Sequence, residues 1–357
     1  MYRFLLFNLL LFCTLNLSAQ NQPHIAGANN PVRIQIKGKF YATPTKTPQN
    51  HVVIASHNKY VYFLNNRGSV VNSYRTRGWI HATPNLLSDN TVGIGSYDGH
   101  FYFFDTEGNM IEKIKPGGFI FTEPVELGNH VVFGSNRGKV MFYDKIAQKL
   151  EKLKLKRLVH GSPFVTSDSI LVVGSNSKLI YFISKDKQLI NTYKTQGWIM
   201  HSKPFELSNG WVIVGSYDKH LYALDTKGNL QWKFCTEGKI HGSPIQLSDG
   251  TIAIGSMDGS LYLLTEQGEL IKKVETGKRI VSSPVKYNDE IFVIGSYDNL
   301  LYFVNTKGGI LARYDLQGKL FSTPIVMHCG TIYCCTANGI MSFLPEGYVR
   351  QLLKSGK

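Results

Sequence analysis

The pair Ser/Thr-Pro, or a close variant of it, recurs eight times along this chain at a nearly constant step. The successive spacings between the prolines are 40, 40, 39, 41, 40, 40 and 40 residues. An internal period of this length is typical of a solenoid, a propeller or an array, and it constrains the architecture more than any local motif does. The eight prolines are Pro44, Pro84, Pro124, Pro163, Pro204, Pro244, Pro284 and Pro324.

Each repeat predicts four short antiparallel strands. Residues 240–278 contain four segments rich in Ile, Val, Leu and Tyr, separated by Gly, Asp and Ser. Asp98-Gly99 and Asp258-Gly259 supply the positive φ angles that two-residue hairpins need. Four strands in about 40 residues, repeated eight times, predict an all-β, eight-bladed β-propeller of four-stranded antiparallel blades. No stretch after the signal region has a helical period, so helix should be scarce.

The ring also needs a way to close. Residues 32–37 match the fourth strand of a repeat, but no first three strands precede them. We expect this N-terminal strand to pair as the outermost strand of the last blade, which would remove a free sheet edge. The tail at 348–353 competes for the same place, and the sequence does not decide between the two.

The first 19 residues have the composition of a secretion signal. Arg3 gives a positive start, residues 5–12 an apolar run, and Ser18-Ala19 a small-residue cleavage site. We therefore expect a signal peptide over 1–19 and a single propeller domain over 20–357. The mature protein would be periplasmic or secreted, without a transmembrane segment, and monomeric.

Four cysteines remain after the signal: Cys235, Cys329, Cys334 and Cys335. An exported chain meets an oxidising compartment, so their disulfide state is open. Their spacing matches no zinc pattern, and we expect no metal site. Cys334 and Cys335 align with the middle of a second strand, where two small buried residues are the simplest interpretation.

The formal net charge is +14, and part of it is concentrated in one segment. Lys152, Lys154 and Lys156 alternate along a predicted outermost strand, followed by Arg157. Such lysines protect a sheet edge from pairing with other chains. The alternative is a contact for an anionic partner such as lipid headgroups, glycan or an acidic protein surface. An exported chain without a recognised binding module is not expected to bind nucleic acid.

The position three residues before each proline forms an aromatic and histidine series. Ring symmetry should place these side chains at one height around the propeller axis. They fit either simple packing of flat rings or a polar layer that contacts a ligand, since histidine titrates near neutral pH and binds metals. The series is Tyr41, His81, Phe121, His160, His201, His241, Val281 and Phe321.

Two further departures from the repeat are candidate sites. Glu123 and Lys203 replace the Ser or Thr that precedes most of the prolines, and they would line the mouth of an axial channel. Trp79 and Trp198 open similar Gly-Trp-Ile segments, but one extra residue separates Trp198 from its proline and predicts a bulge. These tryptophans fit wedges between blades or rim contacts for a partner.

A series of acidic residues has a simpler explanation. Asp98, Asp218, Asp258 and Asp298 lie at the same predicted hairpin of four different blades. We interpret them as turn formers rather than as catalytic carboxylates.

These residues resemble the PQQ-like propeller repeat. The likeness rests on Ser243-Pro244, Gly215-Ser216-Tyr217-Asp218, Leu221-Tyr222-Ala223-Leu224-Asp225 and residues 228–234 (GNLQWKF), and it covers roughly residues 32–345. The family holds quinoprotein dehydrogenases and non-enzymatic propellers, among them the propeller lipoprotein of the outer-membrane Bam complex, which is similar in size and blade number. No calcium triad of the dehydrogenases can be assigned here, so the resemblance implies a PQQ-like fold without PQQ.

The sequence therefore favours an exported, non-catalytic propeller that acts as a protein–protein interaction scaffold in the bacterial cell envelope. Its partner would be another envelope protein, and we expect no cofactor. Two alternatives stay open. One is a propeller that binds a glycan or small ligand in its axial channel, and the other is a reduced quinoprotein oxidoreductase.

Overall fold

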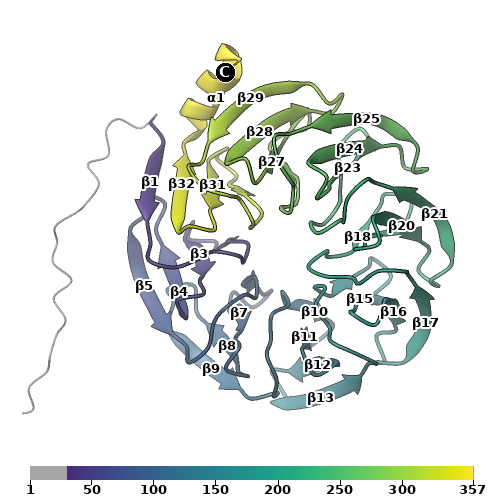
Figure 1. The fold of residues 1–357 in the computed structure, drawn as a ribbon. Helices are drawn as coiled ribbons and strands as arrows, with labels where there is room; N and C mark the ends of the chain where they lie inside the picture. The colour runs from purple at the N-terminus through teal and green to yellow at the C-terminus, as the bar shows by residue number, and fades with distance from the viewer. Residues whose placement is uncertain (1–29, 357) are drawn as a thin grey trace, which may run out of the picture.

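The computed structural model describes residues 30–356, so the predicted signal peptide lies outside the described residues. Eight sheets of four strands each surround a central axis, and the chain passes around the ring from one blade to the next (Figure 1). The predicted eight-bladed propeller is confirmed. One helix, α1 (Glu346–Ser355), follows the last strand within the described residues.

The strands of the first four blades follow the repeat. Blade 1 contains β2 (Thr45–Lys46), β3 (Val52–Ala55), β4 (Tyr60–Leu64) and β5 (Val70–Arg75); blade 2 contains β6 (Asn85–Leu86), β7 (Val92–Gly95), β8 (Phe101–Phe104) and β9 (Met110–Ile114); blade 3 contains β10 (Val125–Leu127), β11 (His130–Ser135), β12 (Lys139–Asp144) and β13 (Lys149–Lys154); and blade 4 contains β14 (Phe164–Val165), β15 (Leu171–Gly174), β16 (Leu179–Ile183) and β17 (Leu189–Lys194).

The last four blades have the same pattern. Blade 5 contains β18 (Phe205–Glu206), β19 (Val212–Gly215), β20 (His220–Leu224) and β21 (Leu230–Cys235); blade 6 contains β22 (Ile245–Gln246), β23 (Ile252–Gly255), β24 (Ser260–Leu264) and β25 (Leu270–Glu275); blade 7 contains β26 (Val285–Lys286), β27 (Ile291–Gly295), β28 (Leu300–Asn305) and β29 (Ile310–Asp315); and blade 8 contains β30 (Ile325–Val326), β31 (Ile332–Cys335), β32 (Ile340–Leu344) and β1 (Val32–Gln35).

The N-terminal strand closes the ring, as the sequence predicts. β1 pairs antiparallel with β32, with Val32 opposite Phe343 and Gln35 opposite Ile340. The competing assignment of the tail to this place is wrong, because residues 346–355 form α1 instead. Val349 and Leu352 of α1 lie three residues apart on one helix face and are buried in the cluster formed with blades 7 and 8.

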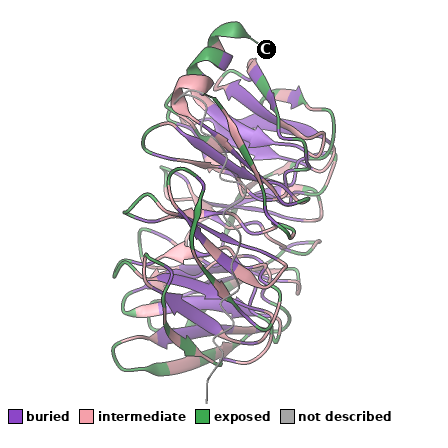
Figure 2. Ribbon diagram, turned by 90° about the vertical axis from the view of Figure 1, so that its left-hand side faces the viewer, coloured by how far each residue is buried: buried purple, intermediate pink, exposed green. Residues whose placement is uncertain are grey.

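The blades pack through a small residue at the end of each second strand. A Cβ built on Gly255 would lie 2.3 Å from Cγ2 of Ile280, the residue that enters the next blade. The same relation links Gly95 to Ile120 and Gly215 to Ile240, so a larger residue would push the blades apart. The middle strands are buried on both faces, whereas the exposed residues gather in the loops and on the outer strands (Figure 2).

The adjacent cysteines fit this pattern. Cys335 aligns with Gly255 and packs in one cluster with Phe40, which enters blade 1 as Ile280 enters blade 7. Cys334 lies in the cluster on the opposite face of β31. Both thiols are buried, and burial raises the pKa of Cys335 to about 12, so it is no thiolate nucleophile at neutral pH. None of the four cysteines in the described chain forms a disulfide.

Candidate functional site

The series three residues before each proline forms one layer of rings across the propeller axis. His201 lies at its centre, with ring centroids 5.1 Å from His81, 4.5 Å from His160 and 4.4 Å from His241. Phe321 packs edge-on against His241 at 4.9 Å. The structure thus brings all four candidate histidines together, with His201 in contact with the other three.

The extra residue of the long repeat explains how His201 reaches the axis. Ile199 takes the buried place that Ile80 fills in blade 2, so the surplus residue lies between Ile199 and Ser202. The amide of Ser202 donates to the carbonyl of Met200 at 2.7 Å, and His201 has a φ of 62°. This left-handed conformation is uncommon for a residue other than glycine. The predicted bulge therefore has a consequence that the sequence did not indicate, since it pushes His201 inward.

The histidine layer is neutral at physiological pH. Burial lowers the pKa of His81 to about 3 and the pKa values of His160 and His241 to about 4. Burial also lowers the pKa of His201 well below its ordinary value, with nearby imidazoles adding to the effect. Charging one ring among the others is unfavourable because it would be poorly solvated and would repel its neighbours.

A histidine that the sequence reasoning missed completes the layer. Nε2 of His57, at the tip of a hairpin in blade 1, lies 3.0 Å from Nδ1 of His81. His81 Nε2 is buried without a hydrogen-bond partner among the described residues. Three other blades have a tyrosine at the place equivalent to His57. Comparing the hairpin tips of the repeats would therefore have drawn attention to His57.

Below the rings lies a second layer, built from the residues that directly precede the prolines. In six places the amide of one blade donates to the hydroxyl of the next, as Ser243 does to Ser283 at 2.8 Å. Glu123 and Lys203 interrupt this circle of hydroxyl groups and form an ion pair, with Nζ and Oε1 2.6 Å apart. The two layers line a cavity of about 260 Å³, and Glu123 and Lys203 are among the residues that line it.

The two tryptophans occupy equivalent places, in spite of their different distances from the prolines. The carbonyl of Trp79 accepts a hydrogen bond from Tyr97, and the carbonyl of Trp198 accepts one from Tyr217, both at 2.9 Å. The Trp79 ring stacks on His57 with centroids 5.5 Å apart. About half of each tryptophan is exposed, so neither is a buried wedge between blades.

The basic patch is less regular than the sequence suggested. Lys152 and Lys154 are exposed on β13, and Lys152 Nζ donates to the carbonyl of Pro116 at 3.1 Å. Lys156 and Arg157 are exposed too, but β13 ends at Lys154, so they lie in the connection to blade 4. The prediction that the three lysines share one strand is therefore wrong.

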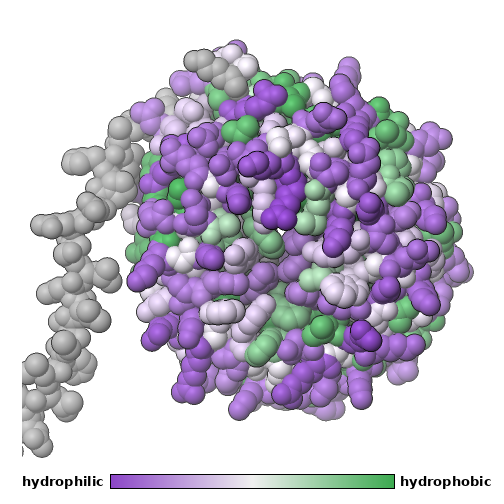
Figure 3. All heavy atoms as spheres, in the orientation of Figure 1, coloured by the Kyte–Doolittle hydropathy of each residue, from purple (hydrophilic) through white to green (hydrophobic). Residues whose placement is uncertain are grey.

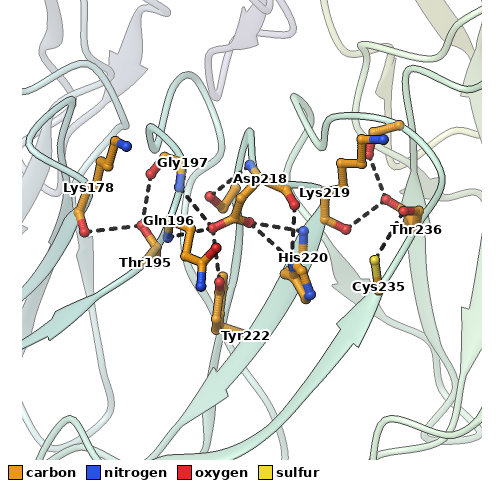
Figure 4. Close-up of polar contacts among 12 residues, drawn as sticks. Lys178, Thr195, Gln196, Gly197, Asp218, Lys219, His220, Tyr222, Cys235 and Thr236 are labelled. Carbon is orange, nitrogen blue, oxygen red and sulfur yellow. Dashed lines mark hydrogen bonds and ion pairs between the residues drawn. The ribbon is translucent and has the colours of Figure 1, made fainter.

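The aspartate series joins neighbouring blades, and Figure 4 shows the contacts of one member, Asp218. Oδ2 of Asp218 accepts hydrogen bonds from the Gln196 amide at 2.7 Å and from the Tyr222 hydroxyl at 2.9 Å. Burial acts to raise the pKa of Asp218, but these hydrogen bonds hold it below its ordinary value. Equivalent bonds are made by Asp98, Asp258 and Asp298.

Other functional features are not found in residues 30–356. No cluster of three or more His, Cys, Asp or Glu side chains there is arranged to hold a metal ion. No helix in the same residues is long and apolar enough to span a membrane. A second cavity, of about 580 Å³, lies at the seam where β1 closes the ring, between Val32, Tyr333 and Phe343.

Comparison with known proteins supports the resemblance to PQQ-like repeats. A family model described as outer membrane protein assembly factor BamB matches residues 218–342. The crystal structure of BamB from Moraxella catarrhalis is similar with a TM-score of 0.75 and 16% identity, over 88% of this chain and 98% of that chain. The computationally designed protein Ika8 is similar with a TM-score of 0.73 and 15% identity, over 87% and 98% of the two chains. No curated protein sequence matches the chain.

Proposed function

We propose that this protein is an exported, non-catalytic propeller that binds another protein of the bacterial cell envelope through one face of its ring. The half-exposed tryptophans Trp79 and Trp198 carry the proposal, because their backbones are fixed by hairpin hydrogen bonds before any partner arrives. A preorganised surface loses little entropy on docking. The match of residues 218–342 to the BamB family model supports the same class of function.

A crosslinking pull-down of the tagged mature protein from its native envelope tests this function. A stoichiometric protein partner is the expected result. Recovery of the propeller alone would contradict the scaffold function and direct attention to the axis. Mass spectrometry of the exported protein would test the signal peptide, with cleavage after Ala19 as the expected outcome.

Binding of a glycan or other small ligand in the axial cavity is the second candidate. The buried, unpartnered Nε2 of His81 and the Glu123–Lys203 pair favour it, because they offer polar groups around one cavity. Joint substitution of His160, His201 and His241 by phenylalanine separates the two functions. A scaffold keeps its protein partner after this change, whereas an axial binder loses its ligand.

A further inference from the structure

One position of the repeat forms a ring on the face of the propeller where the hairpin tips lie. In every blade its carbonyl accepts a hydrogen bond of 2.9 to 3.1 Å from the amide at the tip of the hairpin between strands two and three. The identical bond shows that the eight positions are structurally equivalent, and all eight side chains are exposed. We call them the inner rim: Lys39, Trp79, Phe119, Leu158, Trp198, Lys239, Arg279 and Lys319.

The inner rim is divided into two halves of opposite chemistry. Four consecutive blades present large apolar side chains, with exposed fractions of 53% for Trp79, 47% for Phe119, 37% for Leu158 and 48% for Trp198. The other four blades present only cations, and Lys39 joins that half because β1 brings blade 8 next to blade 1.

Aromatic hairpin tips hold the side chains of both halves in place. Tyr97 stacks on Phe119 with centroids 5.1 Å apart and lies 6.3 Å from Trp79. In the cationic half, the Arg279 guanidinium lies 4.4 Å from the centroid of Tyr297. Stacking of this kind orients a cation without neutralising it.

The cations of the inner rim are not engaged in ion pairs within the described chain. Asp258 and Asp298, in the hairpins of blades 6 and 7, accept hydrogen bonds from the hairpin backbone and from tyrosines and form no ion pair with these cations. The exposed Glu237 is paired with Lys273 at 2.7 Å.

The apolar half is not required by the architecture. Other exposed apolar residues, such as Val70, Ile190 and Leu270, recur near the start of outer strands around the ring. On the inner rim, by contrast, cations fill the equivalent places in four blades without disturbing the hydrogen bond. In Figure 3 hydrophilic groups cover most of the face viewed, with smaller hydrophobic patches between them. Four exposed apolar residues at equivalent places of consecutive blades therefore need a reason other than the repeat.

We propose that the inner rim binds one polypeptide segment of the envelope partner, with apolar side chains at one end and Asp or Glu side chains at the other. The apolar end would contact blades 2 to 5, and the acidic end blades 6, 7, 8 and 1. A lipid bilayer is laterally uniform and has no counterpart to a face divided in this way, whereas an oriented segment has one. The inference rests on the proposed scaffold function and specifies its surface and its partner's chemistry.

Crosslinking from both halves in the native envelope tests the orientation. A photoreactive benzoylphenylalanine introduced at Phe119 reports on the apolar half, and a carbodiimide joins Lys239 or Lys319 directly to carboxylates. We expect both reagents to label one segment of one partner, with apolar residues bound at position 119 and Asp or Glu bound by the lysines. Labels on two unrelated proteins, or on lipid alone, would overturn the proposal.

Paired variants measure the contribution of each half. Trp79→Ala with Trp198→Ala should lower partner recovery on the order of thirtyfold, as for aromatic hot spots. Arg279→Glu with Lys319→Glu should lower it about tenfold, most clearly at low salt. The matched controls, Lys113→Glu with Lys233→Glu and Leu270→Ala with Ile271→Ala, change the same chemistry at exposed residues of outer strands and should leave recovery within about twofold.

The outcomes separate this proposal from the scaffold function itself. If the partner is still recovered with both pairs of inner-rim variants and crosslinks elsewhere, the inner-rim proposal is wrong but the scaffold function stands. Absence of any partner would overturn both. If the protein sediments with phosphatidylglycerol vesicles and both pairs of variants lose this binding, the inner rim binds a membrane and not a polypeptide segment. Circular dichroism must show that every variant is folded.

Discussion

The contacts between neighbouring blades, which we call the walls, and the positions that face the axis belong to the same repeat. They differ in how much their residues vary from one blade to the next. In the walls, Gly95, Gly215 and Gly255 each receive the side chain that enters the next blade, so the contact is almost the same around the ring. At the axis, equivalent positions carry imidazole, benzyl or isopropyl groups, and one blade has gained a residue at His201. What the repeats share therefore determines the fold, and what they do not share determines the surfaces available for binding.

This contrast predicts that the walls carry most of the stability. Phe303, fully buried in β28, faces the small Ala312 on β29. Phe303→Ala should lower the free energy of unfolding by about 3–5 kcal/mol, because the cavity cannot be refilled. Urea unfolding followed by circular dichroism would measure the loss. Ile146→Ala, at a residue that is 85% exposed, should change it by less than about 0.5 kcal/mol.

Blade 5 supplies a natural rescue for that variant. There Ala223 takes the place of Phe303, and Trp232 stands opposite it in place of Ala312. Phe303→Ala combined with Ala312→Trp should therefore recover part of the lost stability. If the double variant were as unstable as the sum of its single changes, the walls would not be interchangeable between blades.

The axis should instead control the response to acid. The pKa of His241 is about 4 in the folded protein, lowered by burial, against about 6.5 in an unfolded chain. Between these values the unfolded state binds more protons, so stability is complete above pH 6.5 and falls as the pH drops towards 4. This residue alone accounts for on the order of 2–3 kcal/mol of that loss.

His241→Phe is the matched test, since phenylalanine already fills the equivalent place at Phe121 and Phe321. Chemical unfolding at pH 4.5 and pH 7.5 should show a smaller difference for the variant than for the wild type. His220→Phe, at a histidine outside the layer, serves as the control. An unchanged pH dependence in His241→Phe would mean that the layer does not behave as one buried cluster.

The Glu123–Lys203 pair should matter less, because both side chains keep some contact with water. Their exposed fractions are 20% and 29%, and the pair joins blade 3 to blade 5 across blade 4. A double-mutant cycle with Glu123→Gln and Lys203→Met should give a coupling of roughly 1 kcal/mol that decreases with salt. A coupling near zero would mean that the pair contributes no more than an exposed ion pair does. The ion pair of Lys149 and Glu151 on β13 is the exposed pair for comparison.

The sequence predicted what repeats and missed what depends on a single blade. Eight prolines and the hairpin glycines were enough for blade number and strand order. The match of residues 32–37 to a fourth strand predicted the closure, although the tail competed for that place, and β1 makes it with residues 32–35. The helix at 346–355 was missed because it occurs once and its packed face is short, with Val349 and Leu352 buried and Tyr348 and Leu353 partly buried beside them. The sequence predicted that the histidines lie at one height around the axis. Their contact across the axis depends on the backbone conformation of His201, which no pattern of residue types encodes.

The smallest expected effect concerns the hairpin tips, where the two regions meet. Lys219 has a φ of 73° at a place that Gly99 and Gly259 fill in other blades. Lys219→Gly removes the left-handed strain of a side chain but adds freedom to the unfolded chain, so the net gain should be about 0.5 kcal/mol. Lys233→Gly, in the extended strand β21, relieves no such strain and should lose a similar amount. If both variants lost stability equally in thermal unfolding, the tips would be as tolerant as the strands, and their conformation would not explain how the inner rim is held.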